Sequence, residues 1–165
     1  PSGDKVLVEQ IVYGESQGNA RNHRGQIYQH YDAAGIVTNS GYDFKGNLVE
    51  SSRQLTDEYK KQVGWSAPPG LTETFTGTTS FDALNRPIQM IAPHSDRPGT
   101  KVNIMQPVYN EPNLLEQLHA WLDKNAEPDG LLDITTANLH AVANIDYNAK
   151  GQRTLIEYGN GVRTE

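Results

Sequence analysis

Short runs of β-prone residues, separated by turn-forming residues, make up most of the hydrophobic and polar pattern of this chain. Val, Ile, Thr and Tyr gather in these runs, and 15 glycines and 9 prolines punctuate them. Such spacing predicts β-strands joined by tight turns. The first predicted strand is Lys5–Tyr13 (KVLVEQIVY). A polar stretch over residues 14–25 predicts a loop, and strand pairing is expected to resume at Gln26.

Four segments repeat one pattern, in which an aromatic residue precedes Asp or Asn, two tolerant positions, and then Gly or Asn. They are Tyr31-Asp32-Ala33-Ala34-Gly35, Tyr42-Asp43-Phe44-Lys45-Gly46, Phe81-Asp82-Ala83-Leu84-Asn85 and Tyr147-Asn148-Ala149-Lys150-Gly151. Asp or Asn at the start of a turn accepts hydrogen bonds from backbone N–H groups ahead of it, and Gly or Asn supplies a positive φ. The aromatic residue is expected to pack across the strand pair, at about 0.5 kcal/mol per cross-strand contact.

This pattern predicts consecutive antiparallel β-hairpins. The predicted structural turn residues are Tyr31, Asp32, Gly35, Tyr42, Asp43, Gly46, Phe81, Asp82, Asn85, Tyr147, Asn148 and Gly151.

One stretch predicts a helix inserted among the strands. Its apolar stripe, at positions i, i+1, i+4, i+7 and i+8, consists of Leu114, Leu115, Leu118, Trp121 and Leu122. This spacing places all of these side chains on one helical face. Asn110 or Glu111 is the expected cap, Pro112 suits the first turn, and Asn125 can end the helix in the left-handed conformation. An amphipathic helix is therefore predicted over residues 112–124.

The remaining segments predict loops and an interrupted repeat. Ser66–Gly70 (SAPPG) and Glu127–Gly130 (EPDG) indicate loops, whereas residues 135–143 fit either a short helical turn or a strand. Residues 154–165 predict a strand, a tight turn and the opening of a further strand. Because a repeat array needs a capping unit, we expect residues 1–165 to form a single segment of a much larger protein.

Composition excludes several classes of function. A net charge of −6 and a pI near 5.3 disfavour a surface that binds nucleic acid. The absence of cysteine excludes disulfides, a thiolate nucleophile and a cysteine-ligated zinc site. No apolar run approaches the roughly 20 residues that span a bilayer, so no direct membrane insertion is expected. Residues 1–4 do not resemble a signal peptide.

The repeated segments resemble the RHS repeat, also called the YD repeat. Tyr42-Asp43-Phe44-Lys45-Gly46-Asn47-Leu48 matches the whole pattern of that repeat. The other copies depart from this pattern after the turn: the first is followed by Ile36, the third by Arg86-Pro87 and the fourth by Gln152-Arg153. The longer runs Gly25–Leu55 and Ile145–Arg163 resemble the RHS-rich part of the B component of bacterial insecticidal toxin complexes, the Tc toxins.

This resemblance implies a fold and a role. In that family the RHS repeats form a spiralling β-sheet that closes, together with the C component, into a hollow shell around a toxic polypeptide. The expected fold is therefore mainly β, a curled sheet segment of consecutive hairpins with the one inserted helix. The expected function is that of a non-catalytic shell segment in a secreted complex, whose partners are the rest of its own shell and a toxin-bearing C component.

Candidate catalytic chemistry is limited to His94-Ser95-Asp96. Adjacent residues do not in general assemble a hydrolase triad, because the base must reach the nucleophile while a third group orients that base. No Gly-x-Ser-x-Gly motif is present, and Pro93 and Pro98 flank the triplet, so a polar loop is predicted. A hydrolase centred on Ser95 is kept as the third alternative.

No metal or cofactor site is predicted. The histidines without ligand spacing are His23, His30, His119 and His140. Trp65 and Trp121 are expected to anchor the core. The recurring aromatic and carboxylate pairs would also suit a calcium or carbohydrate surface, although turn formation explains every position. A secreted carbohydrate-binding or adhesion module built on the same hairpins is therefore the second alternative.

Overall fold

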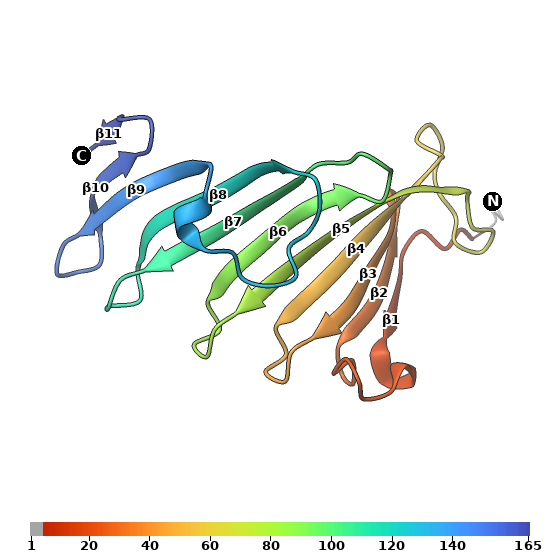
Figure 1. Cartoon of the computed structure of the whole chain (residues 1–165). Helices are drawn as coiled ribbons and strands as arrows, with labels where there is room; N and C mark the ends of the chain where they lie inside the picture. Colours follow the sequence, from red (N-terminus) through yellow and green to blue (C-terminus); the bar gives the residue numbers. More distant parts are fainter. Residues whose placement is uncertain (1–4) are drawn as a thin grey trace. The chain divides into compact units, whose positions relative to one another are not determined.

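The computed structural model describes residues 5–165, and its regular secondary structure is almost entirely β-strand (Figure 1). The strands, with two short 3-10 helices, are β1 (Gln10–Tyr13), η1 (Gly14–Gln17), β2 (Ile27–Asp32), β3 (Gly35–Tyr42), β4 (Leu48–Thr56), β5 (Leu71–Phe81), β6 (Pro87–Ser95), β7 (Val102–Tyr109), β8 (Leu115–Lys124), η2 (Ile134–Thr136), β9 (Leu139–Tyr147), β10 (Arg153–Tyr158) and β11 (Arg163–Thr164). The predicted succession of strands is confirmed. The expectation about a signal peptide concerns residues that lie outside the described range.

The strands follow one another in chain order in an 11-stranded sheet, from β1 to β11. Neighbouring strands such as β2 and β3, or β7 and β8, pair antiparallel. The chain divides into two compact units: residues 1–78 with 93–98, and residues 79–92 with 99–165. The first strand is shorter than the sequence predicts, because its ladder with β2 begins only at Gln10.

The predicted helix over residues 112–124 is wrong, since this stretch forms β8 and the turn that precedes it. Ile104 of β7 pairs directly with Trp121 of β8, and the two side chains are 0% and 1% exposed. Leu122, which the helical stripe would bury, is 41% exposed. Successive strand residues face opposite sides of a sheet, so burying Trp121 turns Leu122 outward.

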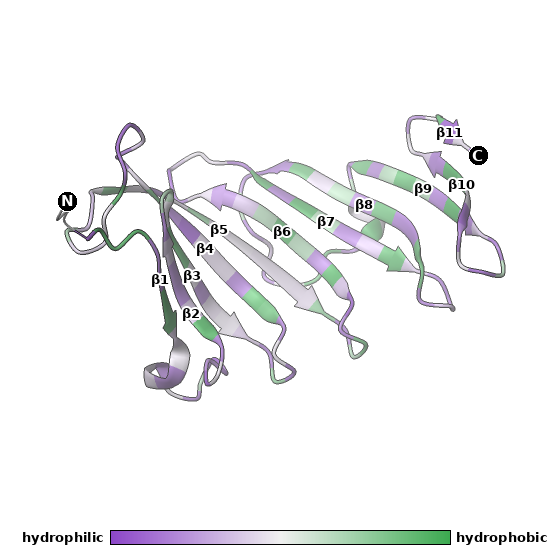
Figure 2. Ribbon diagram, turned by 180° about the vertical axis from the view of Figure 1, so that it is seen from behind, coloured by the Kyte–Doolittle hydropathy of each residue, from purple (hydrophilic) through white to green (hydrophobic). Residues whose placement is uncertain are grey.

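The hydrophobic core of the second unit lies on one face of β6, β7 and β8. It consists of Ile91, Val102, Ile104 and Trp121, against which Leu132 and Ala137 pack. Hydrophobic and hydrophilic residues alternate in bands along β7 and β8 (Figure 2). Such alternation is typical of strands with one buried face.

The connection between β8 and β9 (residues 125–138) folds back over this core (Figure 1). Buried Gln106 donates to the carboxamide oxygen of Gln89 at 2.7 Å and to the carbonyl oxygen of Leu132 at 3.0 Å. Gln89 donates in turn to the carbonyl oxygen of Gly130 at 3.1 Å. The Trp121 indole donates to the hydroxyl of Thr136 at 3.0 Å. These bonds satisfy the buried glutamines and fix the connection over the apolar side chains.

Candidate functional site

Three of the four repeated turns share one hydrogen-bond geometry. In the turn after β3, the Oδ1 atom of Asp43 accepts hydrogen bonds from the backbone N–H groups of Lys45 and Asn47, both at 2.9 Å. The Gly46 N–H donates to the Asp43 carbonyl oxygen at 3.1 Å, and Gly46 has a φ of 87°. The hydrogen bond from the Asn47 side chain is the main cause that holds the pKa of Asp43 below its usual range.

The turns at Asp82 and Asn148 repeat this geometry. Leu84 and Arg86 donate to Asp82 at 2.8 and 3.0 Å, and Asn85 has a φ of 62°. The backbone hydrogen bond from Arg86 is the largest cause that lowers the pKa of Asp82, and the Arg86 side chain adds to it. In the turn at Asn148, the backbone N–H groups of Lys150 and Gln152 donate to the Asn148 side chain at 2.9 and 3.1 Å, and Gly151 has a φ of 73°. Asn therefore replaces Asp without any change of turn.

Sequence reasoning missed a further turn of this kind, between β7 and β8. The Leu114 N–H donates to the Asn110 side chain at 2.9 Å, and Asn113 adopts a φ of 69°. The segment reads Tyr109-Asn110-Glu111-Pro112-Asn113, which is the repeat pattern with Asn at both polar positions. Pro112 occupies the position whose N–H donates in the other turns, and this proline suggested a helix start. The aromatic residue before Asn110 was the signal that would have identified the turn.

The first copy has a tighter geometry. Asp32 and Gly35 face each other directly in the β2–β3 ladder, so only two residues connect the strands. Gly35 has a φ of 141°, and a Cβ atom there would lie 1.9 Å from the Gln54 carbonyl oxygen. Burial raises the pKa of Asp32, but hydrogen bonds from Arg53, Ala34 and Gly35 outweigh it and leave the pKa below its usual range.

The tyrosines before three of the turns tie neighbouring strands together. The hydroxyl of Tyr42, at the end of β3, donates to the carbonyl oxygen of Ile27 at the start of β2, at 2.7 Å. The hydroxyl of Tyr109, at the end of β7, donates to the carbonyl oxygen of Pro87 at the start of β6, at 3.1 Å. Tyr147 at the end of β9 donates to Leu115 at the start of β8, at 2.6 Å. Burial raises the pKa of Tyr42 and of Tyr109, because it disfavours the charged phenolate.

The first tyrosine of the repeat, Tyr31, packs against an aromatic ring instead. Its ring lies 4.9 Å from that of Trp65, edge to face. Trp65 is 7% exposed, and its indole donates to the Asp32 carbonyl oxygen at 3.2 Å. The loop between β4 and β5 is thereby held against the β2–β3 hairpin.

The triplet His94-Ser95-Asp96 does not assemble a triad. The predicted polar loop is wrong for His94 and Ser95, which are successive residues of β6, so their side chains leave opposite faces of the strand. The Ser95 hydroxyl donates to the Glu73 carboxylate, which also pairs with Arg97 at 3.2 Å. Ser95 therefore belongs to an ion-paired cluster on β5 and β6.

Two histidines that are distant in sequence meet across the sheet. His119 of β8 pairs with His140 of β9, and their Nδ1 atoms lie 2.8 Å apart. The Nε2 atom of His119 lies 3.1 Å from the Gln117 carboxamide oxygen, so it donates there while the His119 Nδ1 atom accepts from His140. Burial lowers the pKa of His119, and the neighbouring His140 lowers it further. Within residues 5–165, no group of three or more His, Asp or Glu side chains could hold a metal ion.

Solved structures of toxin complexes share this fold over the whole chain. Crystal structures of TcdB2-TccC3-Cdc42 and of TcdB2-TccC3 without its hypervariable C-terminal region match at TM-scores of 0.73 and 0.75, with 22% and 20% identity. The Tc holotoxin pore of Photorhabdus luminescens matches at a TM-score of 0.78 with 20% identity. Each alignment covers 100% of this chain, which spans about 7% of the matched chains.

The resemblance to Tc toxin components, expected from the repeated motif, is confirmed at the level of the fold. The sequence matches no model of a known protein family and no curated protein.

Proposed function

We propose that this chain is a non-catalytic segment of a toxin-complex shell, which encloses a toxic polypeptide and helps to deliver it. The observation that carries the proposal is the structural likeness of this whole chain to about 7% of the matched chains of TcdB2-TccC3 complexes, in a chain built from one repeated hairpin. A sheet of this kind grows by adding hairpins, so a shell wall can be made from many such units. The mechanism is steric, because the wall separates the cargo from solvent, proteases and host targets.

The partners under this proposal are the remainder of the same shell protein and a toxin-bearing C component, with residues 1–165 as one segment of the larger chain. Nucleic acid and membrane insertion play no part in the proposal, and the complex is secreted. The net charge of −6 supports the first of these exclusions. Within residues 5–165, no helix is long and apolar enough to cross a membrane.

The turn residues have a structural role in this proposal. The Asp and Asn side chains satisfy backbone N–H groups at the end of each hairpin, and the residues of positive φ close the turn. Their regular use keeps successive strands in register, which a continuous wall requires.

The experiment that tests the proposal isolates the native polypeptide with an antibody raised against this segment. We expect an intact mass far above 18.3 kDa and co-purification of a second polypeptide that resists protease until the complex is dissociated. A band near 18.3 kDa with no protected partner would contradict the proposal.

Two glycine variants of the full-length protein sharpen this experiment. Gly35→Ala should expose the protected polypeptide to protease, because the new Cβ atom would collide with the Gln54 carbonyl oxygen. Gly130→Ala is the matched control, since a Cβ atom there meets nothing within 4 Å, and it should preserve the protection.

A further inference from the structure

The connection between β1 and β2 (residues 14–26) is the feature that the shell role leaves unexplained. The β2–β3 and β3–β4 turns reverse the chain within a few residues, whereas this connection, like the one between β4 and β5, makes a long excursion. Its path is fixed by the protein. The Tyr42 N–H donates to the Arg21 carbonyl oxygen at 3.0 Å, and the Asn22 side chain donates to the Tyr42 carbonyl oxygen at 2.9 Å.

A buried histidine anchors the same connection. His23 is 4% exposed, and its Nε2 atom lies 2.9 Å from the Asn39 carbonyl oxygen. The rings of Tyr28 and Tyr42 meet the imidazole edge to face, with centroids 5.4 and 6.0 Å away. The backbone of the connection is therefore fixed before any ligand arrives, which reduces the ordering that binding would require.

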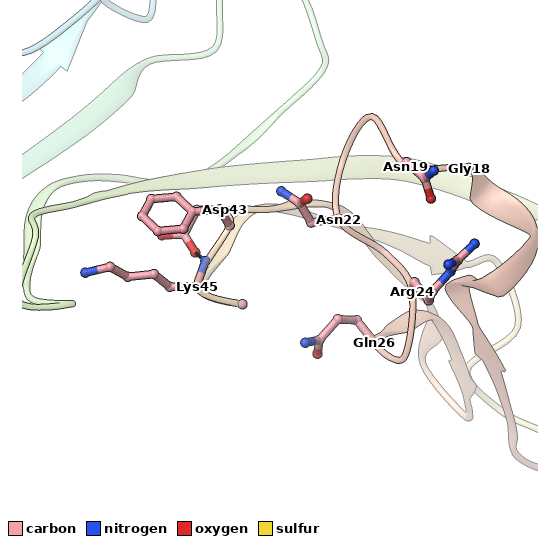
Figure 3. A pocket seen from close by; sticks show the side chains of 9 residues that line it. Gly18, Asn19, Asn22, Arg24, Gln26, Asp43 and Lys45 are labelled. Carbon is pink, nitrogen blue, oxygen red and sulfur yellow. Dashed lines mark hydrogen bonds between the residues drawn. The ribbon is translucent and has the colours of Figure 1, made fainter.

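This connection and the turn after β3 enclose an open cavity of about 530 Å³, within the range typical of small-ligand sites. Its lining residues are Gly18, Asn19, Asn22, Arg24, Gln26, Asp43, Phe44, Lys45 and Gly46. Figure 3 shows Asn22 and Gln26 extending from the connection towards the turn that carries Asp43 and Lys45.

Several polar side chains of the cavity make no hydrogen bond within the part of the chain that the structure describes. Within residues 5–165, no hydrogen bond or ion pair involves the side chains of Asn19, Arg24 or Gln26. Two carboxamides supply both donors and acceptors, and the guanidinium supplies a charged, forked donor. The carboxylate of Asp43, in contrast, is engaged in the turn itself.

Phe44 adds an apolar ring to this polar lining. Its side chain is 86% exposed, and the Nζ atom of Lys45 lies 5.7 Å from the ring centroid. The turn does not need an aromatic residue here, because the same position holds Ala83, Glu111 and Ala149 in the other turns. A ligand with a flat apolar face would cover the ring and gain from removing it from water.

We propose that this cavity binds a saccharide that carries a carboxylate, with a sugar ring stacked on Phe44 and the carboxylate paired with Arg24. A pyranose offers an apolar C–H face for the ring and hydroxyl groups for the carboxamides of Asn19 and Gln26. Guanidinium and carboxylate form a charge-assisted pair, so an acidic sugar binds more tightly than its neutral counterpart. This inference goes beyond the proposed shell function and does not depend on it.

The test titrates the purified chain with 3′-sialyllactose and with lactose, using ligand-observed NMR. We expect saturable binding with sialyllactose the tighter ligand, a loss of about tenfold or more in affinity in Phe44→Ala, and loss of the preference in Arg24→Gln. Leu84→Ala is the matched control, because it removes another exposed apolar side chain from an equivalent turn and should leave binding unchanged.

Three outcomes would overturn the proposal. The first is no saturable binding of either sugar by the unaltered chain at millimolar concentration, and the second is unchanged sialyllactose binding in Phe44→Ala. The third is equal affinity for lactose and sialyllactose in the unaltered chain, which would show that the carboxylate of the ligand does not pair with Arg24. Melting curves check that each variant is folded, which we expect for changes at exposed positions.

Discussion

Trp121 and Leu122 are neighbours in sequence, but the structure predicts very different costs for removing their side chains. Trp121 is 1% exposed in the core, whereas Leu122 is 41% exposed on the other face of β8. An aromatic side chain buries about 150–250 Å², which corresponds to roughly 4–6 kcal/mol at about 25 cal/mol per Å² as an upper bound. Measured truncations of buried Trp or Phe cost about 3–5 kcal/mol, so we expect about 4 kcal/mol for Trp121→Ala.

Leu122→Ala should cost about 1 kcal/mol or less, because much of that side chain already contacts water. The free energy of unfolding is measured by urea denaturation followed by far-UV circular dichroism, which does not depend on the tryptophan that is removed. If Trp121→Ala is too unstable to fold, Trp121→Phe serves instead. It keeps most of the apolar contact, loses the hydrogen bond to Thr136 and should cost about 1–2 kcal/mol.

A helix over residues 112–124 would place both side chains in one buried stripe, so their truncations would cost similar amounts. A loss for Leu122→Ala that equals the loss for Trp121→Ala would therefore refute the strand assignment and the reasoning from alternate faces.

Three further predictions concern the turns and the paired histidines. Tyr147→Phe removes the hydrogen bond to the Leu115 carbonyl oxygen and should lower the free energy of unfolding by about 1 kcal/mol, measured by urea denaturation. The double change Asp43→Ala with Gly46→Val removes the side-chain acceptor and forces a branched residue to a φ of 87°, so the melting temperature should fall. Unchanged melting would count against the structural role of this turn. Because the pKa of His119 is lowered in the folded state, the unfolded chain binds the additional proton as the pH falls below about 6.5. Stability should therefore decline from pH 7 to pH 5, and urea denaturation of His119→Gln should show a weaker decline.

The sequence by itself was sufficient to predict the strands that end in a recognisable turn. Asp43 and Asn148 each bind N–H groups within four residues along the chain, and the glycines that close these turns lie three residues away. Because all of these interactions are local, the same few residues fold in the same way wherever they occur. Because the turn that begins at Asn110 uses the same local interactions, it could in principle have been predicted from the sequence. Pro112 and the leucines that follow it suggested a helix instead.

Tertiary structure alone decided the state of residues 115–124. The spacing of the leucines and Trp121 fits one helical face, and strand periodicity is a weak signal over so few residues. The ladder with β7 and the connection that covers Trp121 bury one strand face, and these contacts override local preference. Tertiary structure also decided the contact between His119 and His140 and the cavity beside Phe44. Their members lie on different strands or loops, and only strand pairing and the fixed course of the β1–β2 connection bring them together.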